Sequence, residues 1–146
     1  MERNVLRVKR LRLGARLPER ATEGSSGFDL YACTDGQADL VLSRRPQRVG
    51  TGIAIEFPRG FDVQVRPRSG LAAKGVGVMF GTIDSDYRGE VLVTMYLFGD
   101  LEEYRIANGD RIAQLVVTRL GELDVVGAEE LTDTARGVGG HGSTGQ

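Results

Sequence analysis

The residues best suited to chemistry lie together in one short segment, residues 81–91. Asp84, Ser85 and Asp86 favour a turn, because their short polar side chains compete for nearby backbone groups. Tyr87 and Arg88 follow directly, and the apolar stretch 91–98 is typical of a strand. The pattern predicts a hairpin whose turn holds two carboxylates, a phenol and a guanidinium. A carboxylate there can act as a general base on a positioned water, whereas the simpler alternative is a polar surface turn.

A second set of residues is suited to holding an anion. Ser69 is expected to cap a short helix that begins near Gly70, the one helical piece that the sequence predicts. The start of a helix leaves backbone N–H groups free, and Arg68 beside them favours an anion site. A structural cap alone would explain Ser69 but would leave the flanking arginines without a role.

Two polar residues interrupt otherwise apolar stretches. Asp29 lies between Phe28 and Leu30, where it either caps a turn or faces a cation or the water molecules of a ligand. Gln114 lies in the apolar run 111–117, so its amide must be satisfied by another strand or by a ligand.

The last eleven residues, 136–146, are rich in glycine. Glycines let backbone amides wrap closely around an anion, and Ser143 and Thr144 add hydroxyl groups. Gly137 and Gly142 have the spacing of a P-loop, but Ser143 stands where the lysine should be and no helix follows. The segment therefore predicts either an anion-binding arm or a disordered end.

Composition narrows the classes of function. A chain of 146 residues that is 40% hydrophobic predicts one domain with its own core. The formal net charge of −1 gives no global positive field, so neither nucleic acid nor an anionic membrane is an expected partner. Cys33 is the one cysteine and His141 the one histidine, which argues against a disulfide and a zinc site and makes the cytoplasm the expected compartment. No signal peptide or membrane-spanning run is evident.

Most of the remaining sequence predicts short strands separated by turns. Apolar residues alternate in 6–13, in 53–57 and in 61–65, and the last two runs read as a hairpin around Pro58. Leu123, Val125 and Val126 are expected to end the ordered part. The sequence thus predicts an all-β, jelly-roll-like barrel or sandwich with one short helix, covering residues 1–134, and a flexible Gly-rich C-terminal arm over residues 135–146.

Five segments, taken in order, resemble the five motifs of the trimeric dUTP diphosphatases (dUTPases). They are residues 27–32, 67–72, 81–91, 109–115 and 136–145. The resemblance runs from the N-terminal strand to the last residues. It implies a jelly-roll subunit in a homotrimer with shared active sites. It also implies an enzyme that hydrolyses dUTP to dUMP and pyrophosphate by attack of water on the α-phosphorus, which keeps uracil out of DNA and supplies dUMP for dTMP synthesis.

The resemblance also implies a role for each matching residue. Asp84 would be the general base, and Tyr87 would pack against deoxyribose and exclude a 2′-hydroxyl. The backbone of Gly81, Thr82 and Ile83 would bind the edge of uracil, and Asp29 would bind waters of a Mg²⁺ ion. The phosphates would be held by Arg68, Ser69, Gly70 and Gln114. The arm would close over the nucleotide through Arg136, His141, Gly142, Ser143 and Thr144.

Two features depart from the family pattern. His141 stands where the family usually has a phenylalanine stacked on uracil. The connection from Gly75 to Phe80 is also short, and residues 78–80 lack the asparagine often found before the hairpin. Two alternatives remain at this level: an enzyme related to dCTP deaminase, which shares the fold, and a non-catalytic regulatory protein on the same fold.

Overall fold

The computed structural model describes residues 4–142 of the chain. Its elements are β1 (Arg7–Arg10), β2 (Gly27–Tyr31), β3 (Leu40–Leu42), β4 (Gln47–Gly50), β5 (Ile53–Glu56), β6 (Phe61–Arg66), α1 (Ser69–Ala73), β7 (Val76–Val78), β8 (Gly81–Ile83), β9 (Leu92–Leu97), β10 (Tyr104–Ile106) and β11 (Arg111–Arg119). The fold is therefore all-β with one short helix, as the sequence predicts. Ser143 and Thr144 lie outside the described residues.

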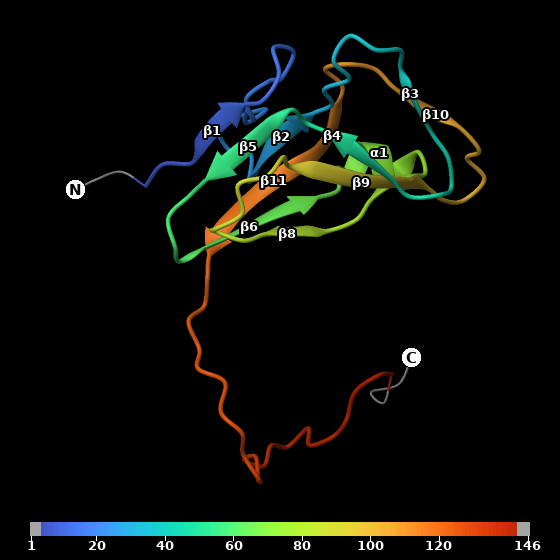
Figure 1. The fold of residues 1–146 in the computed structure, drawn as a ribbon. Helices are drawn as coiled ribbons and strands as arrows, with labels where there is room; N and C mark the ends of the chain where they lie inside the picture. The colour runs from blue at the N-terminus through green and yellow to red at the C-terminus, as the bar shows by residue number, and fades with distance from the viewer. Residues whose placement is uncertain (1–3, 143–146) are drawn as a thin grey trace.

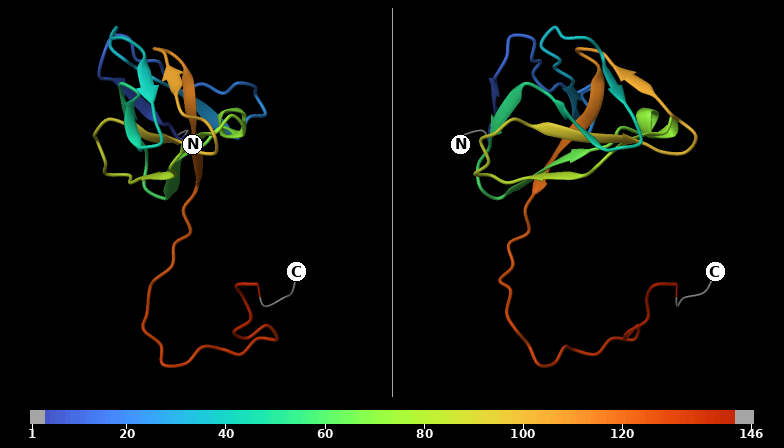
Figure 2. Two further views of the ribbon diagram at one scale, coloured as in Figure 1. Left: turned by 90° about the vertical axis from the view of Figure 1, so that its right-hand side faces the viewer. Right: turned by 45° about the vertical axis from the view of Figure 1, so that its right-hand side comes forward.

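Two main sheets enclose a single core. One has the strand order β2-β11-β6-β8 and the other the order β4-β9-β7, while β1-β5 and β10-β3 form two-stranded sheets. The strands wrap around one another in a jelly-roll-like arrangement, with α1 at one end (Figures 1 and 2). Val63 and Leu115 from the first sheet and Val93 and Met95 from the second are fully buried in one apolar cluster. Burying each such side chain contributes roughly 1.5–3 kcal/mol, so this cluster holds the two sheets together.

Alternating burial explains why the strands form where they do. In β9, Val93, Met95 and Leu97 are buried, whereas Leu92 is exposed and the residues between them are half-buried. A period of two places alternate side chains on opposite faces of a sheet, so one face of β9 covers the core. The same alternation appears in β6, where Val63 and Val65 are the buried residues.

Both predicted hairpins are wrong. β5 pairs with β1 and not with β6, and β8 pairs with β6 whereas β9 pairs with β4 and β7. The turns themselves are present: Arg59 and Gly60 form one, and Ser85 and Asp86 form the other. Each turn carries the chain from one sheet to another, so the strands on either side of it pair with strands distant in sequence.

The predicted cap of α1 is also wrong. The N-cap residue is Arg68, with extended backbone angles, and no side chain makes a capping hydrogen bond. Ser69 is already the first helical residue and is exposed, and Pro67 and Arg68 connect β6 to the helix. The Ser69 hydroxyl therefore makes no capping hydrogen bond.

At both ends of the chain, regular structure covers fewer residues than the sequence predicts. β1 ends at Arg10, and Leu13 is fully exposed. At the other end, β11 stops at Arg119, and Leu123, Val125 and Val126 are 92%, 101% and 79% exposed, so these three residues do not end the packed part. The segment beyond β11 runs away from the β body in every view (Figures 1 and 2). Within residues 4–142, no helix has the length and apolar character needed to span a bilayer.

Candidate active site

Asp84 lies at the end of an edge strand. β8 pairs only with β6 among the described strands, in a register that places Ile83 beside Val63 and Gly81 beside Val65. The outer edge of β8 therefore presents backbone N–H and C=O groups without a strand partner. Asp84 follows at once and is exposed, and its carbonyl accepts a hydrogen bond of 3.1 Å from the Tyr87 amide, which closes the predicted turn.

A cavity of about 550 Å³ lies beside this strand end. It brings together three of the predicted site residues, Thr82, Ile83 and Asp84. The rest of its lining comes from the β5–β6 turn, from the start of β6, from the Ser85–Asp86 turn and from the chain just after β11: Arg59, Gly60, Phe61, Asp62, Ser85, Asp86, Leu120 and Glu122. The carboxylate of Asp84 thus borders a space large enough for a small polar substrate.

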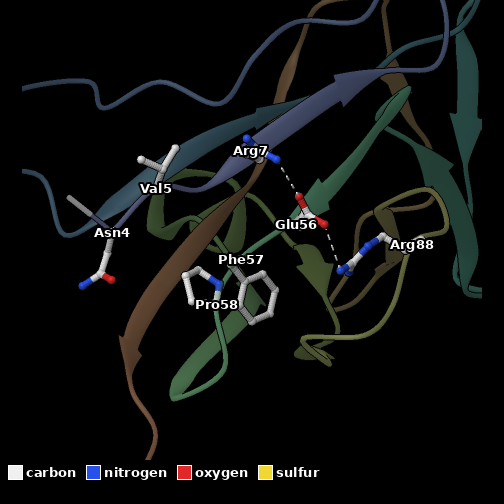
Figure 3. Close-up of a pocket in the computed structure, with 7 residues that line it drawn as sticks. All are labelled: Asn4, Val5, Arg7, Glu56, Phe57, Pro58 and Arg88. Atoms are coloured by element: carbon white, nitrogen blue, oxygen red, sulfur yellow. Dashed lines mark hydrogen bonds and ion pairs between the residues drawn. The ribbon is translucent and has the colours of Figure 1, made fainter. Parts of the chain in front are cut away.

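Tyr87 folds back over its own turn. Its hydroxyl donates a hydrogen bond of 2.9 Å to the carbonyl of Glu90, and the residue remains 44% exposed. Arg88 braces the same turn from the outside: it donates to the carbonyls of Ser85 at 2.8 Å and Tyr87 at 3.1 Å. Its other nitrogen pairs with Glu56 at 3.2 Å, and Glu56 lies between Arg88 and Arg7 (Figure 3). These contacts fix the turn that carries Asp84.

A second ion pair anchors the C-terminal end of the turn. Arg12 binds both carboxylate oxygens of Glu90, one of them at 3.1 Å, and also forms an ion pair with Asp35. The hydrogen bond from Arg12 holds the pKa of the Glu90 carboxyl below its ordinary value, and the same contact raises the pKa of Arg12. Both side chains are mostly covered, with 29% and 20% of their surfaces exposed. Glu90 is therefore a fixed anion at the end of the turn.

A separate cluster gathers the predicted phosphate and metal residues. The Asp29 carboxylate, 12% exposed, lies between two guanidiniums: Arg68 Nε is 3.5 Å from one oxygen and Arg111 Nη1 is 3.6 Å from the other. Gln114 lies beside Asp29 in the sheet, and its side-chain nitrogen donates to the carbonyl of Pro67 at 2.8 Å. Two positive charges around one carboxylate leave the cluster with a net positive charge, which suits an anionic ligand.

The Asp84 turn and the cluster around Asp29 lie far apart within the chain. Asp29 is paired with Gln114, and Gln114 is paired on its other side with Arg66 of β6. Ile83 is paired with Val63 of β6, so the next residue, Asp84, lies opposite Asp62. Arg66 and Asp62 are four positions apart along β6. Four residues of strand span about 13 Å, and the three strand spacings from β2 to β8 add about 14 Å across the sheet, which gives a separation of about 19 Å. A single chain therefore does not place Asp84 beside the cluster around Asp29.

The predicted arm residues are not brought to either group. Arg136 donates from Nε to the carbonyl of Gly139 at 2.6 Å, a contact within the arm itself. His141 is exposed and adopts a positive φ of 51°, which is uncommon for a residue with a side chain. Arg136, His141 and Gly142 belong to the extended segment that leaves the β body after β11 (Figure 1).

Sequence reasoning missed three residues that contact or anchor the residues of the candidate site. Arg111 contacts Asp29, and its signal was its place beside Asp110 in the fourth motif. Glu90 was part of the turn segment but had no role assigned to it. Arg12 carries no local signal, because its partner Glu90 is 78 residues away in the chain.

The motifs and the fold both match one family. A sequence model of the dUTPase family matches residues 14–145. The chain belongs to the dUTPase family. Among curated relatives, deoxyuridine 5'-triphosphate nucleotidohydrolase from Hydrogenobaculum sp. is 51% identical over 145 residues, covering 96% of this chain and 97% of its own.

Solved dUTPase structures share this fold. Staphylococcus bacteriophage 80alpha dUTPase with dUPNHPP matches with a TM-score of 0.87 and 27% identity, covering 99% of this chain and 100% of its own. A mutant dUTPase from phage phi11 of S. aureus, described with a structural Mg(II) ion, matches with a TM-score of 0.76 and 24% identity over 87% of this chain and 98% of its own. The jelly-roll-like fold that the sequence predicts is that of the dUTPases.

Proposed function

We propose that this chain is a dUTP diphosphatase, a hydrolase that converts dUTP to dUMP and pyrophosphate. Membership of the dUTPase family supports this assignment. The observation that carries it is the edge strand β8, which ends in the exposed carboxylate of Asp84 beside a cavity. The reaction keeps uracil out of DNA and supplies dUMP for dTMP synthesis, and the single Cys33 favours a cytoplasmic location.

The free edge of β8 suits recognition of uracil. A uracil ring presents one N–H donor between two carbonyl acceptors, and an edge strand presents N–H and C=O groups in alternation. The backbone of Gly81, Thr82 and Ile83 is therefore proposed to bind this edge of the base. Cytosine has a donor where uracil has an acceptor, so its hydrogen bonds do not match. The methyl group of thymine would clash with the β8 backbone that lies close to the ring.

Asp84 is proposed to act as the general base. An ionised carboxylate within hydrogen-bond reach of a water orients it and accepts its proton as the oxygen attacks the α-phosphorus. The bond from the α-phosphorus to the bridging oxygen breaks, and pyrophosphate leaves. Arg68 and Gln114, with the backbone of Ser69 and Gly70, are proposed to hold the phosphates, because their groups can stabilise the negative charge on the transferred phosphoryl oxygens.

The distance between Asp84 and the phosphate cluster supports a site shared between subunits. About 19 Å is longer than a triphosphate and one water molecule can bridge, so the base and the phosphate residues of one site come from different copies of the chain. A homotrimer, the assembly that the family resemblance implies, supplies three such sites. Arg136, His141 and Gly142, together with Ser143 and Thr144, are proposed to close over the nucleotide, and the extended path of the arm after β11 is consistent with a reach to a neighbour.

The Asp29 carboxylate fits a magnesium ion carried by the nucleotide. No group of three or more His, Cys, Asp or Glu residues gathers as a metal centre within the described part of the chain. Mg²⁺ in proteins commonly keeps several waters and binds through one carboxylate and the phosphates of its substrate, which a lone Asp29 allows. When bound, the ion neutralises charge on the triphosphate. Asp29 would hold it through water, in place of the guanidiniums that flank the carboxylate here.

The test of the function is the release of pyrophosphate from four nucleotides. Purified protein is incubated with dUTP, dCTP, UTP or dTTP, each with and without Mg²⁺, and pyrophosphate and ammonia are measured. Release of pyrophosphate from dUTP alone is the expected result. Ammonia from dCTP would indicate a deaminase, and no turnover of any nucleotide would indicate a regulatory protein on this fold.

Replacing Tyr87 with alanine is expected to weaken the selection of deoxyribose. Without the ring, nothing at this position excludes a 2′-hydroxyl, so the ratio of kcat/KM for UTP to that for dUTP should rise by about tenfold or more, the scale on which a pocket discriminates one small group. The ratio is measured by competition between the two nucleotides. An unchanged ratio would mean that another group excludes ribose.

Replacing His141 with phenylalanine is expected to strengthen binding of the base. Stacking a base on an aromatic side chain contributes roughly 1–3 kcal/mol, and an imidazole recovers only part of it because it is smaller and costs more to desolvate. KM for dUTP should therefore fall several-fold at saturating Mg²⁺ while kcat changes little. Identical KM values in the two proteins would show that residue 141 does not touch the base.

A further inference from the structure

The position of the Tyr87 ring depends on the backbone at the end of its turn. The Tyr87 hydroxyl donates a hydrogen bond of 2.9 Å to the carbonyl of Glu90, and the ring lies directly over Gly89. A Cβ atom at Gly89 would fall 2.6 Å from the ring carbon Cζ, so the ring occupies space that only glycine leaves free. Any shift of the Glu90 backbone therefore moves the hydroxyl and, with it, the ring.

The backbone of Glu90 is held from both sides. Its side chain is bound by Arg12 through two contacts and accepts a hydrogen bond of 3.4 Å from the amide of Gly52. The pair fills a niche against Gly50, where an added Cβ would fall 2.9 Å from Arg12 Nη2. The next residue, Val91, is held by Ile53 at 2.8 Å and by the buried hydroxyl of Thr51 at 2.6 Å.

The brace at the other end of the turn is more exposed. Arg88 and Glu56 have 53% and 46% of their side-chain surfaces open to solvent (Figure 3). An exposed ion pair contributes little to stability, because water screens it and both side chains lose freedom when they pair. The covered, bidentate Arg12–Glu90 pair is the stronger hold, since an arginine fork binding both carboxylate oxygens fixes geometry as well as charge.

We propose that Arg12 and Glu90 are positioning residues that determine selection of deoxyribose over ribose, by fixing the backbone on which Tyr87 rests. This inference rests on the proposed hydrolysis of dUTP, in which the ring of Tyr87 excludes a 2′-hydroxyl. Exclusion by contact requires a ring that cannot retreat, and the hydroxyl bond to the Glu90 carbonyl prevents that retreat only while Glu90 itself is held. Neither residue touches the nucleotide in this scheme.

The experiment compares the preference for dUTP over UTP, as a ratio of kcat/KM values, in a series of variants. Glu90→Gln keeps the shape of the side chain and removes its charge, and Arg12→Met removes the partner. Each is expected to lower the preference by about five- to tenfold, within the range for discrimination of one small group. The double variant should be no worse than either single one, because both act through one contact. Tyr87→Phe, which removes only the hydroxyl bond, should lower the preference to a similar extent without altering the ion pair.

Glu56→Gln is the matched control, since it removes the exposed brace on the same turn and should leave the preference within about twofold of the unmodified protein. Thermal unfolding of each variant reports whether it is folded. The inference is overturned if Glu90→Gln keeps the original preference, which includes an equal loss of turnover for both nucleotides. It is also overturned if Tyr87→Phe keeps the original preference. Absence of pyrophosphate release from dUTP by the unmodified protein is a different result, because it removes the proposed function itself.

Discussion

Replacing Asp84 with asparagine is expected to lower the turnover of dUTP by roughly 10²–10⁴-fold, the usual contribution of a general base. The amide has the size of the carboxylate but cannot accept a proton from the attacking water. Asp84 is exposed at the end of β8 and makes no ion pair within residues 4–142, so its loss should leave the fold intact. Single-turnover kinetics measures the chemical step, and equilibrium binding of dUPNHPP should be nearly unchanged.

Asp62→Asn is the matched control for Asp84→Asn. Asp62 lines the same cavity and is level with Asp84 on the neighbouring strand, but it accepts a hydrogen bond of 2.9 Å from Gln64 and has no role in the proposed reaction. Its replacement should change turnover by less than about tenfold, as expected for a nearby surface charge. Equal losses in the two variants would mean that negative charge in the cavity matters but that Asp84 is not the base.

Removing the arm after Thr134 is expected to abolish most of the activity and leave the protein folded. The buried core ends at Leu115, so no core residue is lost with the arm. The arm carries Arg136, His141 and Gly142, which are proposed to close the site and exclude bulk water. Turnover of dUTP is compared for the full chain and the truncated chain, and circular dichroism and sedimentation report fold and assembly.

A point variant tests whether the arginine side chain of the arm contributes to activity, separately from the arm as a whole. Arg136→Ala keeps the length of the arm and removes its one arginine, so it should lower kcat/KM for dUTP by a smaller factor than the truncation. Full turnover by a truncated, correctly assembled protein would show that the arm has no part in the reaction.

The elements that depend on local chemistry were predictable from the sequence. The turn at Ser85–Asp86 forms where short polar side chains cluster, and α1 appears within one residue of the expected position. β4 and β7 were not predicted, because Gln47–Gly50 contains one valine and Val76–Val78 is too short to show a period. Strand pairing was mispredicted for the same reason in both hairpins, since alternation identifies a strand but not its partner.

In the candidate site too, residues within local motifs were predictable, and contacts between distant parts of the chain were not. Asp84, Tyr87 and Arg68 were identifiable because they lie within short motifs. The ion pair of Arg12 with Glu90 was not, because it joins residues 78 positions apart and arginines alternate with apolar residues throughout the N-terminal segment. The separation of Asp84 from Asp29 is likewise a property of strand order and register, which the sequence does not state.

The separation of about 19 Å between Asp84 and the Asp29 cluster has a genetic consequence. On the proposed shared site, a chain that lacks its base and a chain that lacks its phosphate residues can restore each other, because a mixed assembly contains some sites with both parts intact. The converse also holds. A chain that lacks both parts removes function from the normal chains with which it assembles, because it leaves a normal base and a normal phosphate cluster without a partner. A chain that lacks only one part does not. A mutation that inactivates both parts of one gene's product then lowers the activity of the product of a normal gene in the same cell. The size of this loss depends on the proportion in which the two chains are made.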